Sequence, residues 1–268
     1  VLSVAHQLPW TPEFSALIDC VRSGTPGRIQ SIHAACFGKV FDQGSHLIDL
    51  IARLLPDDEP IWIEACGSDA LRDLAPLCNL PAGFKADTSH PGLLWTAAHI
   101  RMRSGVDVRL DCGLLDACPL PDLGPWLQKR INVIGESGVA EAHCASHCKY
   151  AGKKEATFER KSDLAAYEGA LVGFYHALAQ QLDGQPQTQT ADAVREINTV
   201  TMMCAINKAA QVGVPINWAL ERDSSPDCGE ATKAVQAIKP GISVIIPMED
   251  HRGMGIDAIR SWTSGQRC

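Results

Sequence analysis

Residues 97–111 read AAHIRMRSGVDVRLD, and this stretch decides the type of fold. The segments 97–103 and 106–111 alternate apolar and polar residues on either side of Ser104 and Gly105. A period of two is typical of a strand with one buried face, and a Ser-Gly pair suits a tight turn between two strands. The stretch therefore predicts a β-hairpin, and with it an antiparallel sheet.

The elements around this hairpin extend the sheet and add helices. Further strands are predicted at 1–6, 28–34 and 61–65, and a second hairpin at 130–134 and 139–143. Helices are predicted at 11–22, 43–55, 164–182 and 190–213, the third with an apolar stripe at helical spacing. Because strands and long helices are grouped and do not alternate, the pattern indicates an α+β fold. We expect an open, predominantly antiparallel β-sheet with helices packed on one face.

The chain divides into three parts by composition. Residues 1–218 carry the regular pattern, residues 219–240 are polar and predict a linker, and residues 241–268 begin a new segment with an apolar strand at 242–247. Residues 112–126 are rich in glycine and proline, so we expect a loop that helps to shape specificity.

Charge and composition exclude several classes of protein. The formal net charge is -7 and no run of Lys or Arg is long enough to grip a phosphate backbone, which argues against nucleic acid as a partner. The longest apolar runs are too short to span a bilayer, so we expect no membrane partner and a cytoplasmic location. Eleven scattered cysteines without a CxxC pair indicate reduced thiols.

A metal site is not expected, although residues 143–148 read HCASHC. If the strand at 139–143 continues through these residues, alternate side chains point to opposite faces of the sheet. The histidines and cysteines would then be separated, and we predict ordinary residues at a strand end.

Residues 42–49 read DQGSHLID and carry the clearest chemical pattern. At about 100° per residue, Asp42, His46 and Asp49 share one stripe of a helix, and Leu47 and Ile51 fall on the opposite side. A histidine near neutral pKa beside a carboxylate suits acid–base work on a hydroxyl group. The alternative is an amphipathic helix that Asp42 caps and on which His46 lies at the surface.

A family resemblance bears on this alternative. The segment 38–49, GKVFDQGSHLID, is similar to the signature of the Gfo/Idh/MocA family, named for glucose–fructose oxidoreductase and inositol dehydrogenase, with Asp, Gly, His and Asp at the same spacing. The resemblance covers roughly residues 1–218. It includes the segments GRI at 27–29, IGESG at 134–138, FYHAL at 174–178 and AAQVGVPI at 209–216.

The resemblance implies the substrate-binding, sheet-forming C-terminal domain of an oxidoreductase. It implies that His46 accepts the proton of the substrate hydroxyl and that Asp42 supports His46 and contacts substrate. Asp49 is expected to support the site, and together with Gln43 and Lys39 it is a candidate substrate contact. The implied substrate is a sugar, nucleotide-sugar or cyclitol, and the implied assembly is a homo-oligomer through the sheet face.

The sequence also departs from the family pattern. Neither the GxGxxG loop of its Rossmann domain nor its Glu-Lys-Pro motif is present, and strand 1–6 resembles the last strand of that domain. We therefore expect NAD or NADP in a full-length protein, with no cofactor bound by this chain alone, which would be inactive. The tail at 241–262 resembles the start of family-2 glycosyltransferases. The rival hypothesis is a non-catalytic sugar-binding or dimerisation module, fused to a glycosyltransferase.

Overall fold

A computed structural model of the chain describes residues 2–4, 6–70, 90–113, 127–152, 157–183, 193–219 and 244–246. The predicted loop at 112–126 and the predicted linker at 219–240 lie almost wholly outside these residues, so the division into domains stays a prediction.

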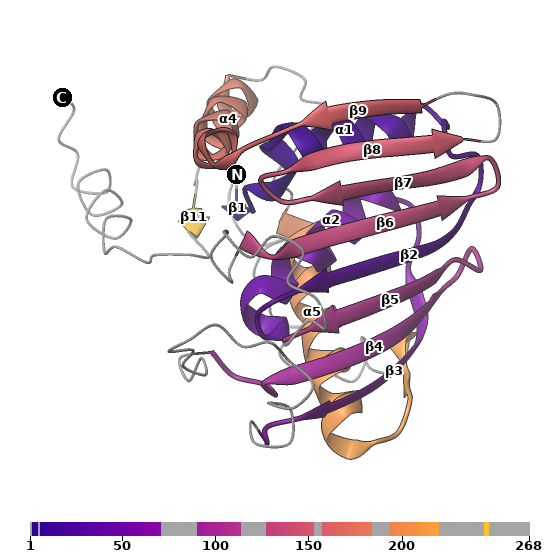
Figure 1. The fold of residues 1–268 in the computed structure, drawn as a ribbon. Helices are drawn as coiled ribbons and strands as arrows, with labels where there is room; N and C mark the ends of the chain where they lie inside the picture. Colours follow the sequence, from indigo (N-terminus) through magenta and orange to yellow (C-terminus); the bar gives the residue numbers. More distant parts are fainter. Residues whose placement is uncertain are drawn as a thin grey trace, which may run out of the picture.

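The core of the molecule is a nine-stranded sheet (Figure 1). Its order is β10-β3-β4-β5-β2-β6-β7-β8-β9, so β10 and β9 are outermost. The central strand β2 (Ile29–Cys36) pairs in parallel with β5 (Asp107–Cys112), and every other pairing is antiparallel. The remaining strands are β3 (Pro60–Ser68), β4 (Trp95–Met102), β6 (Lys129–Gly135), β7 (Gly138–His143), β8 (His147–Gly152), β9 (Thr157–Lys161) and β10 (Ile216–Asn217).

Both predicted hairpins are present, β4 with β5 and β6 with β7, and the second ends at His143 as predicted, so the condition that its strand continues through residues 144–148 is not met. The strand ends at His143 and does not run on through residue 148. Residues 144–146 make a tight turn in which Ala145 has a φ of 52°, and β8 begins at His147. Alternation of polar and apolar residues cannot reveal such a turn, because a left-handed alanine is uncommon.

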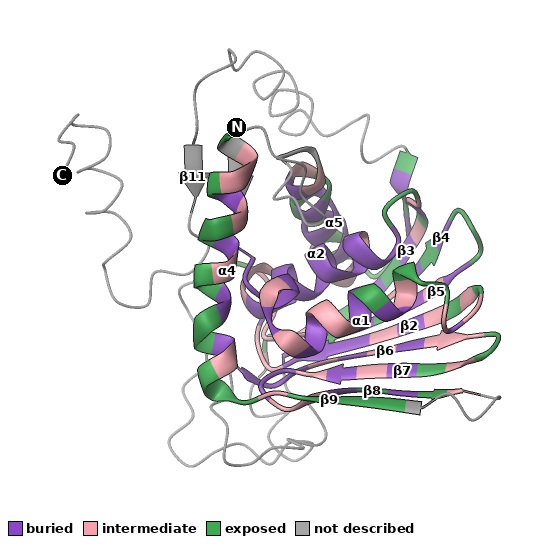
Figure 2. Cartoon of the chain, turned by 90° about the horizontal axis from the view of Figure 1, so that it is seen from above, coloured by how far each residue is buried: buried purple, intermediate pink, exposed green. Residues whose placement is uncertain are grey.

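Three helices cover one face of this sheet (Figure 2). Helix α1 (Pro12–Arg22) packs on β7 and β8, α2 (Ser45–Leu54) on β2, and α5 (Ala193–Val212) on β3 and β4. Helix α1 begins as predicted, since Thr11 Oγ1 accepts a hydrogen bond from the Phe14 amide. Helix α5 ends as predicted at Gly213, whose φ is 69°. The predicted α+β class and the one-sided arrangement are confirmed.

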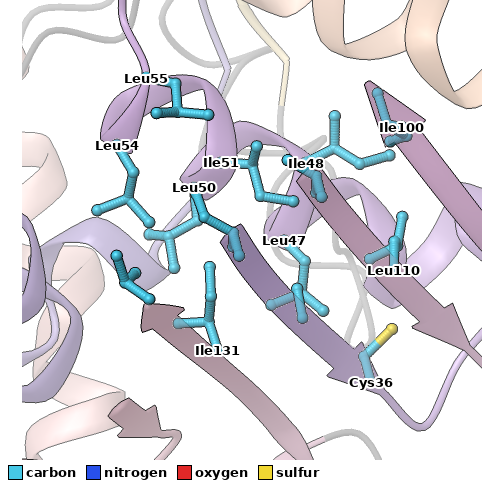
Figure 3. Packing of buried hydrophobic residues seen from close by; sticks show 14 of the residues in the cluster. Cys36, Leu47, Ile48, Leu50, Ile51, Leu54, Leu55, Ile100, Leu110 and Ile131 are labelled. Carbon is cyan, nitrogen blue, oxygen red and sulfur yellow. The ribbon is translucent and has the colours of Figure 1, made fainter. Parts of the chain in front are cut away.

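Helix α2 is the centre of the apolar core. Leu47, Ile48, Leu50 and Ile51 are at most 1% exposed. They pack among Cys36 of β2, Ile100 of β4, Leu110 of β5 and Ile131 of β6 (Figure 3). Full burial of each such side chain stabilises the fold by about 1.5–3 kcal/mol, so the sheet fixes the position and rotation of α2.

Helix α4 (Leu164–Leu182) lies at one end of the sheet beside the short helix η1 (Leu8–Trp10). Asp163 Oδ1 caps it by accepting from the Ala166 amide at 2.8 Å. The predicted apolar stripe is only partly buried: Tyr167, Phe174 and Leu178 are inside, whereas Leu164 and Leu171 are exposed. Helical spacing therefore predicted the helix correctly. It did not predict that part of the apolar stripe remains exposed among the described residues.

A separate pair of strands lies beyond the large sheet (Figure 1). Strand β1 (Leu2–Val4) pairs in parallel with β11 (Val244–Ile246), so both strands predicted at 1–6 and 242–247 are present in shortened form. Among the described residues, no helix is both long and apolar enough to cross a membrane.

Candidate functional site

The chain enters α2 through a wide turn. Residues Val40–Gly44 form a single π-helical turn, η2, and the α-helix begins only at Ser45. Asp42 lies within this turn, and its backbone carbonyl accepts a hydrogen bond from Ser45 Oγ at 2.6 Å. The N-cap position of α2 belongs to Gly44, so the alternative in which Asp42 caps the helix is wrong. Single π turns inside helices are frequent at functional sites.

The π turn also changes the predicted stripe. The prediction applied α-helical spacing from Asp42 onward, but regular spacing starts three residues later. Asp42 is half-buried on the turn, whereas His46 is 1% exposed and Asp49 is fully buried. The alternative that places His46 at the surface is therefore wrong as well. Helix α2 is buried on both sides, between the sheet and helix α5.

Gly44 permits a close approach of the turn to the sheet. A Cβ atom at this residue would lie 2.8 Å from Cys112 Sγ and 3.3 Å from the Lys39 carbonyl oxygen. The glycine thus lets the turn pack directly on β5, and this contact sets the height of α2 above the sheet.

His46 belongs to a buried chain of polar groups. Its Nδ1 lies 3.3 Å from Nδ1 of His6, and His6 Nε2 lies 3.0 Å from Oε2 of Glu196 on α5. The two imidazole rings meet edge to face at an interplanar angle of 82°. None of the three residues is more than 6% exposed. The structure therefore links α2, the segment before η1 and α5 through one hydrogen-bonded path.

The surroundings of His6 and Glu196 shift the pKa of both groups at the far end of this path. Burial alone would lower the pKa of His6, but the hydrogen bond that His6 donates to Glu196 and the charge of Asp49 outweigh it, so the pKa of His6 is raised. Burial raises the pKa of Glu196. Oε1 of Glu196 is buried without a hydrogen-bond partner among the described residues. An unpartnered buried carboxylate oxygen is costly and rare, and this one makes Glu196 a functional candidate.

Asp49 supports α2 beside this path, and its charge acts on both His6 and Glu196. Its Oδ2 accepts from Nε of Arg53 at 2.8 Å, and its Oδ1 accepts from Nε of Arg195 on α5 at 3.0 Å. Burial raises the pKa of Asp49, but Arg53, His6 and Arg195 together lower it to about 2. Asp49 therefore carries a full negative charge that holds α2 against α5.

The other two candidate contacts lie on the turn. Gln43, which is 2% exposed, donates from Nε2 to Oδ1 of Asp42 at 2.6 Å. Lys39 is 8% exposed, and its Nζ donates to the His90 carbonyl at 2.9 Å. The structure thus brings Gln43 to Asp42 on the turn and places His46 and Asp49 in the buried network behind it.

Several members of the network escape prediction from sequence. His6, Glu196 and Arg195 lie 40 residues or more from His46, and no spacing pattern connects them to it. Arg53 could have been found, since it follows Asp49 by four residues and such pairs meet on a helix.

Dinucleotide-binding domains hold the pyrophosphate at a glycine-rich connection between a strand and the helix that follows it. In this chain the connection of that kind next to the candidate site runs from β2 to η2. It contains one glycine, Gly38, at which a Cβ atom would lie 2.4 Å from Cγ of Gln43. The glycine is therefore covered by a side chain and does not form an open cradle for a pyrophosphate. This strand-to-helix connection does not fit NAD or NADP.

No family model and no curated protein matches the sequence, whereas many solved structures match the fold. An oxidoreductase from Agrobacterium radiobacter, solved with NAD+, L-tartaric acid and magnesium, aligns with a TM-score of 0.60 at 13% identity, over 81% of this chain and 65% of that chain. An inositol dehydrogenase homolog from Azotobacter vinelandii aligns at 12% identity over 80% of this chain and 64% of that chain. Its NAD+ complex has a TM-score of 0.58, and its complex with NADH and myo-inositol one of 0.54.

The chain has the fold of these oxidoreductases. It spans just under two thirds of their length, 65% of the Agrobacterium protein and 64% of the Azotobacter protein. At 12–14% identity the likeness concerns the fold alone. It agrees with the type of domain that the resemblance at residues 38–49 implied.

Proposed function

We propose that this chain is the substrate-binding part of an oxidoreductase that uses NAD or NADP to oxidise a hydroxyl group of a sugar, nucleotide-sugar or cyclitol. The buried path from His46 through His6 to Glu196 is the observation that carries the proposal. The fold supports it, since a neighbour of the same fold was solved with NADH and myo-inositol.

In the proposed reaction this chain's own residues handle the proton. His46 takes the hydroxyl proton at Nε2 and releases the Nδ1 proton to His6, which passes its Nε2 proton to Glu196. An imidazole suits this task because it can accept a proton at one nitrogen while it donates from the other. Asp49 and its two arginines hold α2 in position. Asp42 supports the reacting group, and Gln43 and Lys39 remain candidate substrate contacts.

The reaction also needs a hydride acceptor. We propose that NAD or NADP fills this role, bound by a nucleotide-binding domain made of residues other than those described here. The prediction that this chain alone binds no cofactor and is inactive follows from the same reasoning.

Substitution of His46 tests the assignment in a protein that includes such a domain. We expect His46→Gln to lower turnover of polyol or cyclitol substrates by about 10²–10⁴-fold, which is the usual contribution of a general base. Turnover is measured as NADH or NADPH formation, and circular dichroism checks the fold. His99→Gln is the matched control, because His99 lies on the open sheet face beside Asp107. Equal turnover of His46→Gln and wild type would exclude His46 as the base.

The rival is a non-catalytic module that binds a sugar or dimerises through its sheet. The face of the sheet opposite the helices favours it, because that face carries the partly exposed apolar side chains of Trp62 and Val139. Titration of the protein with NAD and NADP by calorimetry separates the two hypotheses. Sugar binding without nucleotide binding, in a protein that includes every upstream residue, supports the rival. The glycosyltransferase resemblance at 241–268 lies almost wholly outside the described residues and stays a prediction.

A further inference from the structure

Two histidines and a glutamate meet on the open face of the sheet, far in the fold from the buried network. Glu141 and His143 belong to β7, and His147 is the first residue of β8. The turn at Ala145 makes His143 and His147 direct partners across the hairpin. One ligand atom from each of the three side chains lies within 4.8 Å of the others.

The spacing of these atoms suits a small cation. Nε2 of His147 lies 3.3 Å from Oε1 of Glu141, and Nε2 of His143 lies 3.8 Å from Oε2. In tetrahedral zinc sites each ligand atom is about 2.0–2.2 Å from the metal, so ligand atoms are roughly 3.3–3.6 Å apart. One pair already has this spacing. The rings of His143 and His147 are stacked, with centroids 4.8 Å apart and an interplanar angle of 18°, so side-chain rotation must turn both Nε2 atoms toward one ion.

The outer hydrogen bond of His147 allows its other ring nitrogen to act as a ligand. Nδ1 of His147 lies 2.9 Å from Oγ of Ser146, which can accept its proton and leave the Nε2 lone pair toward Glu141. Two imidazoles and a carboxylate thus lie close enough together for all three side chains to bind one cation.

The two cysteines of the HCASHC segment are not part of this cluster. Cys144 and Cys148 are fully buried, on the helix side of the sheet. Burial raises the pKa of Cys148 to about 12, so it stays a thiol. The ligand set is therefore two nitrogens and one carboxylate oxygen, which suits zinc and similar first-row divalent ions better than copper(I).

We propose that Glu141, His143 and His147 bind one divalent transition-metal ion of the zinc class, with water in the fourth position. The histidine side chains are 16% and 18% exposed and Glu141 is 39% exposed, so an ion reaches the site from solvent. Arg130 and Lys149 are cationic neighbours that weaken binding, and Lys161 is the cross-strand partner of His147. The site does not depend on the oxidoreductase assignment.

Titration with Zn²⁺ and Co²⁺ tests the proposal on chelator-treated protein whose exposed thiols, such as Cys66 and Cys204, are alkylated. We expect one equivalent of Zn²⁺ to bind and to raise the melting temperature. Co²⁺ should give weak visible bands without the strong near-ultraviolet band of thiolate ligation. Glu141→Gln and His147→Gln should each weaken binding at least tenfold, and Ser146→Ala should weaken it less.

The matched control is His99→Gln, because His99 also lies on the open face 2.9 Å from a carboxylate, that of Asp107, but belongs to no three-ligand group among the described residues. Its affinity for Zn²⁺ should equal that of wild type. The proposal is overturned if wild-type protein binds no ion, if both ligand variants bind as tightly as wild type, or if Co²⁺ shows thiolate bands. Circular dichroism of each variant establishes that lost affinity is not lost folding.

Discussion

Asp49 sits between two guanidinium groups where water does not reach, and its charge is the counterion for both. Removal of one partner from a buried ion pair leaves the other charge uncompensated, which typically costs about 3–5 kcal/mol. The exposed ion pairs on the sheet face contribute much less to the free energy of unfolding, because solvent screens their charges.

We predict that Asp49→Asn lowers the free energy of unfolding by about 3–5 kcal/mol, measured by denaturant titration at neutral pH. Asp107→Asn is the control, since Asp107 contacts His99 and Arg101 on the surface, and should cost less than about 1 kcal/mol.

The same prediction has a pH signature. The folded-state pKa of Asp49 is lowered from 3.8 to about 2, so its contribution is present above pH 3.8 and is lost as the pH falls through about 2. Between neutral pH and about pH 2, the free energy of unfolding of Asp49→Asn should fall by about 2 kcal/mol less than that of wild type. Parallel acid-unfolding curves for the two proteins would contradict the assignment of a full charge to Asp49.

At the scale of single residues, the sequence indicates half of the candidate site. The order Asp, Gly, His, Asp in residues 42–49 is local, and the π turn η2 with the helix α2 that follows it positions all four residues. His6 and Glu196 are brought to His46 only by the packing of α5 and η1 on α2. Contacts over 40 and 190 residues of sequence leave no periodic signal.

At the scale of elements, two glycines at helices differ in the space around them: Gly44 directly before α2 and Gly169 within α4. A Cβ at Gly44 would press on Cys112 Sγ at 2.8 Å, whereas a Cβ at Gly169 in α4 would meet nothing within 4 Å. Overpacking costs about 1–3 kcal/mol, whereas alanine in an open helical position gains about 0.4–1 kcal/mol.

We therefore predict opposite effects on the free energy of unfolding: Gly44→Ala destabilises and Gly169→Ala stabilises. The double variant Gly44→Ala with Cys112→Ala should be more stable than the sum of its single effects, because the contact that causes the strain is removed. Additive effects in this double-mutant cycle would show that contact with Cys112 does not cause the strain in Gly44→Ala.

Elements with their own local signals were predictable. Helix α1 has the cap at Thr11 and Pro12, and α5 has Gly213 at its end. The start of α2 was misplaced, since its approach is a π turn that side-chain spacing does not reveal. Strand β8 was missed as a separate element, because a single left-handed alanine at position 145 reverses the chain without the usual glycine or asparagine.

At the scale of the whole molecule, none of the described helices packs on the sheet face opposite α1, α2 and α5. We predict that copies of the chain associate through it. Trp62→Glu and Val139→Glu should each lower the mass measured by light scattering, since Trp62 is partly exposed and Val139 is 43% exposed on this face. Val172→Glu on α4, where the side chain is 71% exposed, is the control and should not change the mass. A monomeric wild type, or equal masses for all variants, would exclude this face as the interface.

The two outermost strands of the sheet hinder the addition of further strands at its edges. A sheet edge offers unpaired backbone groups to any passing strand, and proteins blunt such edges with charge, proline or short length. At one edge, β9 carries Glu159, Arg160 and Lys161 in succession, all exposed. At the other, β10 is two residues long and follows Pro215. Fibre-like extension along the sheet is thereby disfavoured at both ends, so the molecule can keep a broad exposed β-surface without becoming a template for aggregation.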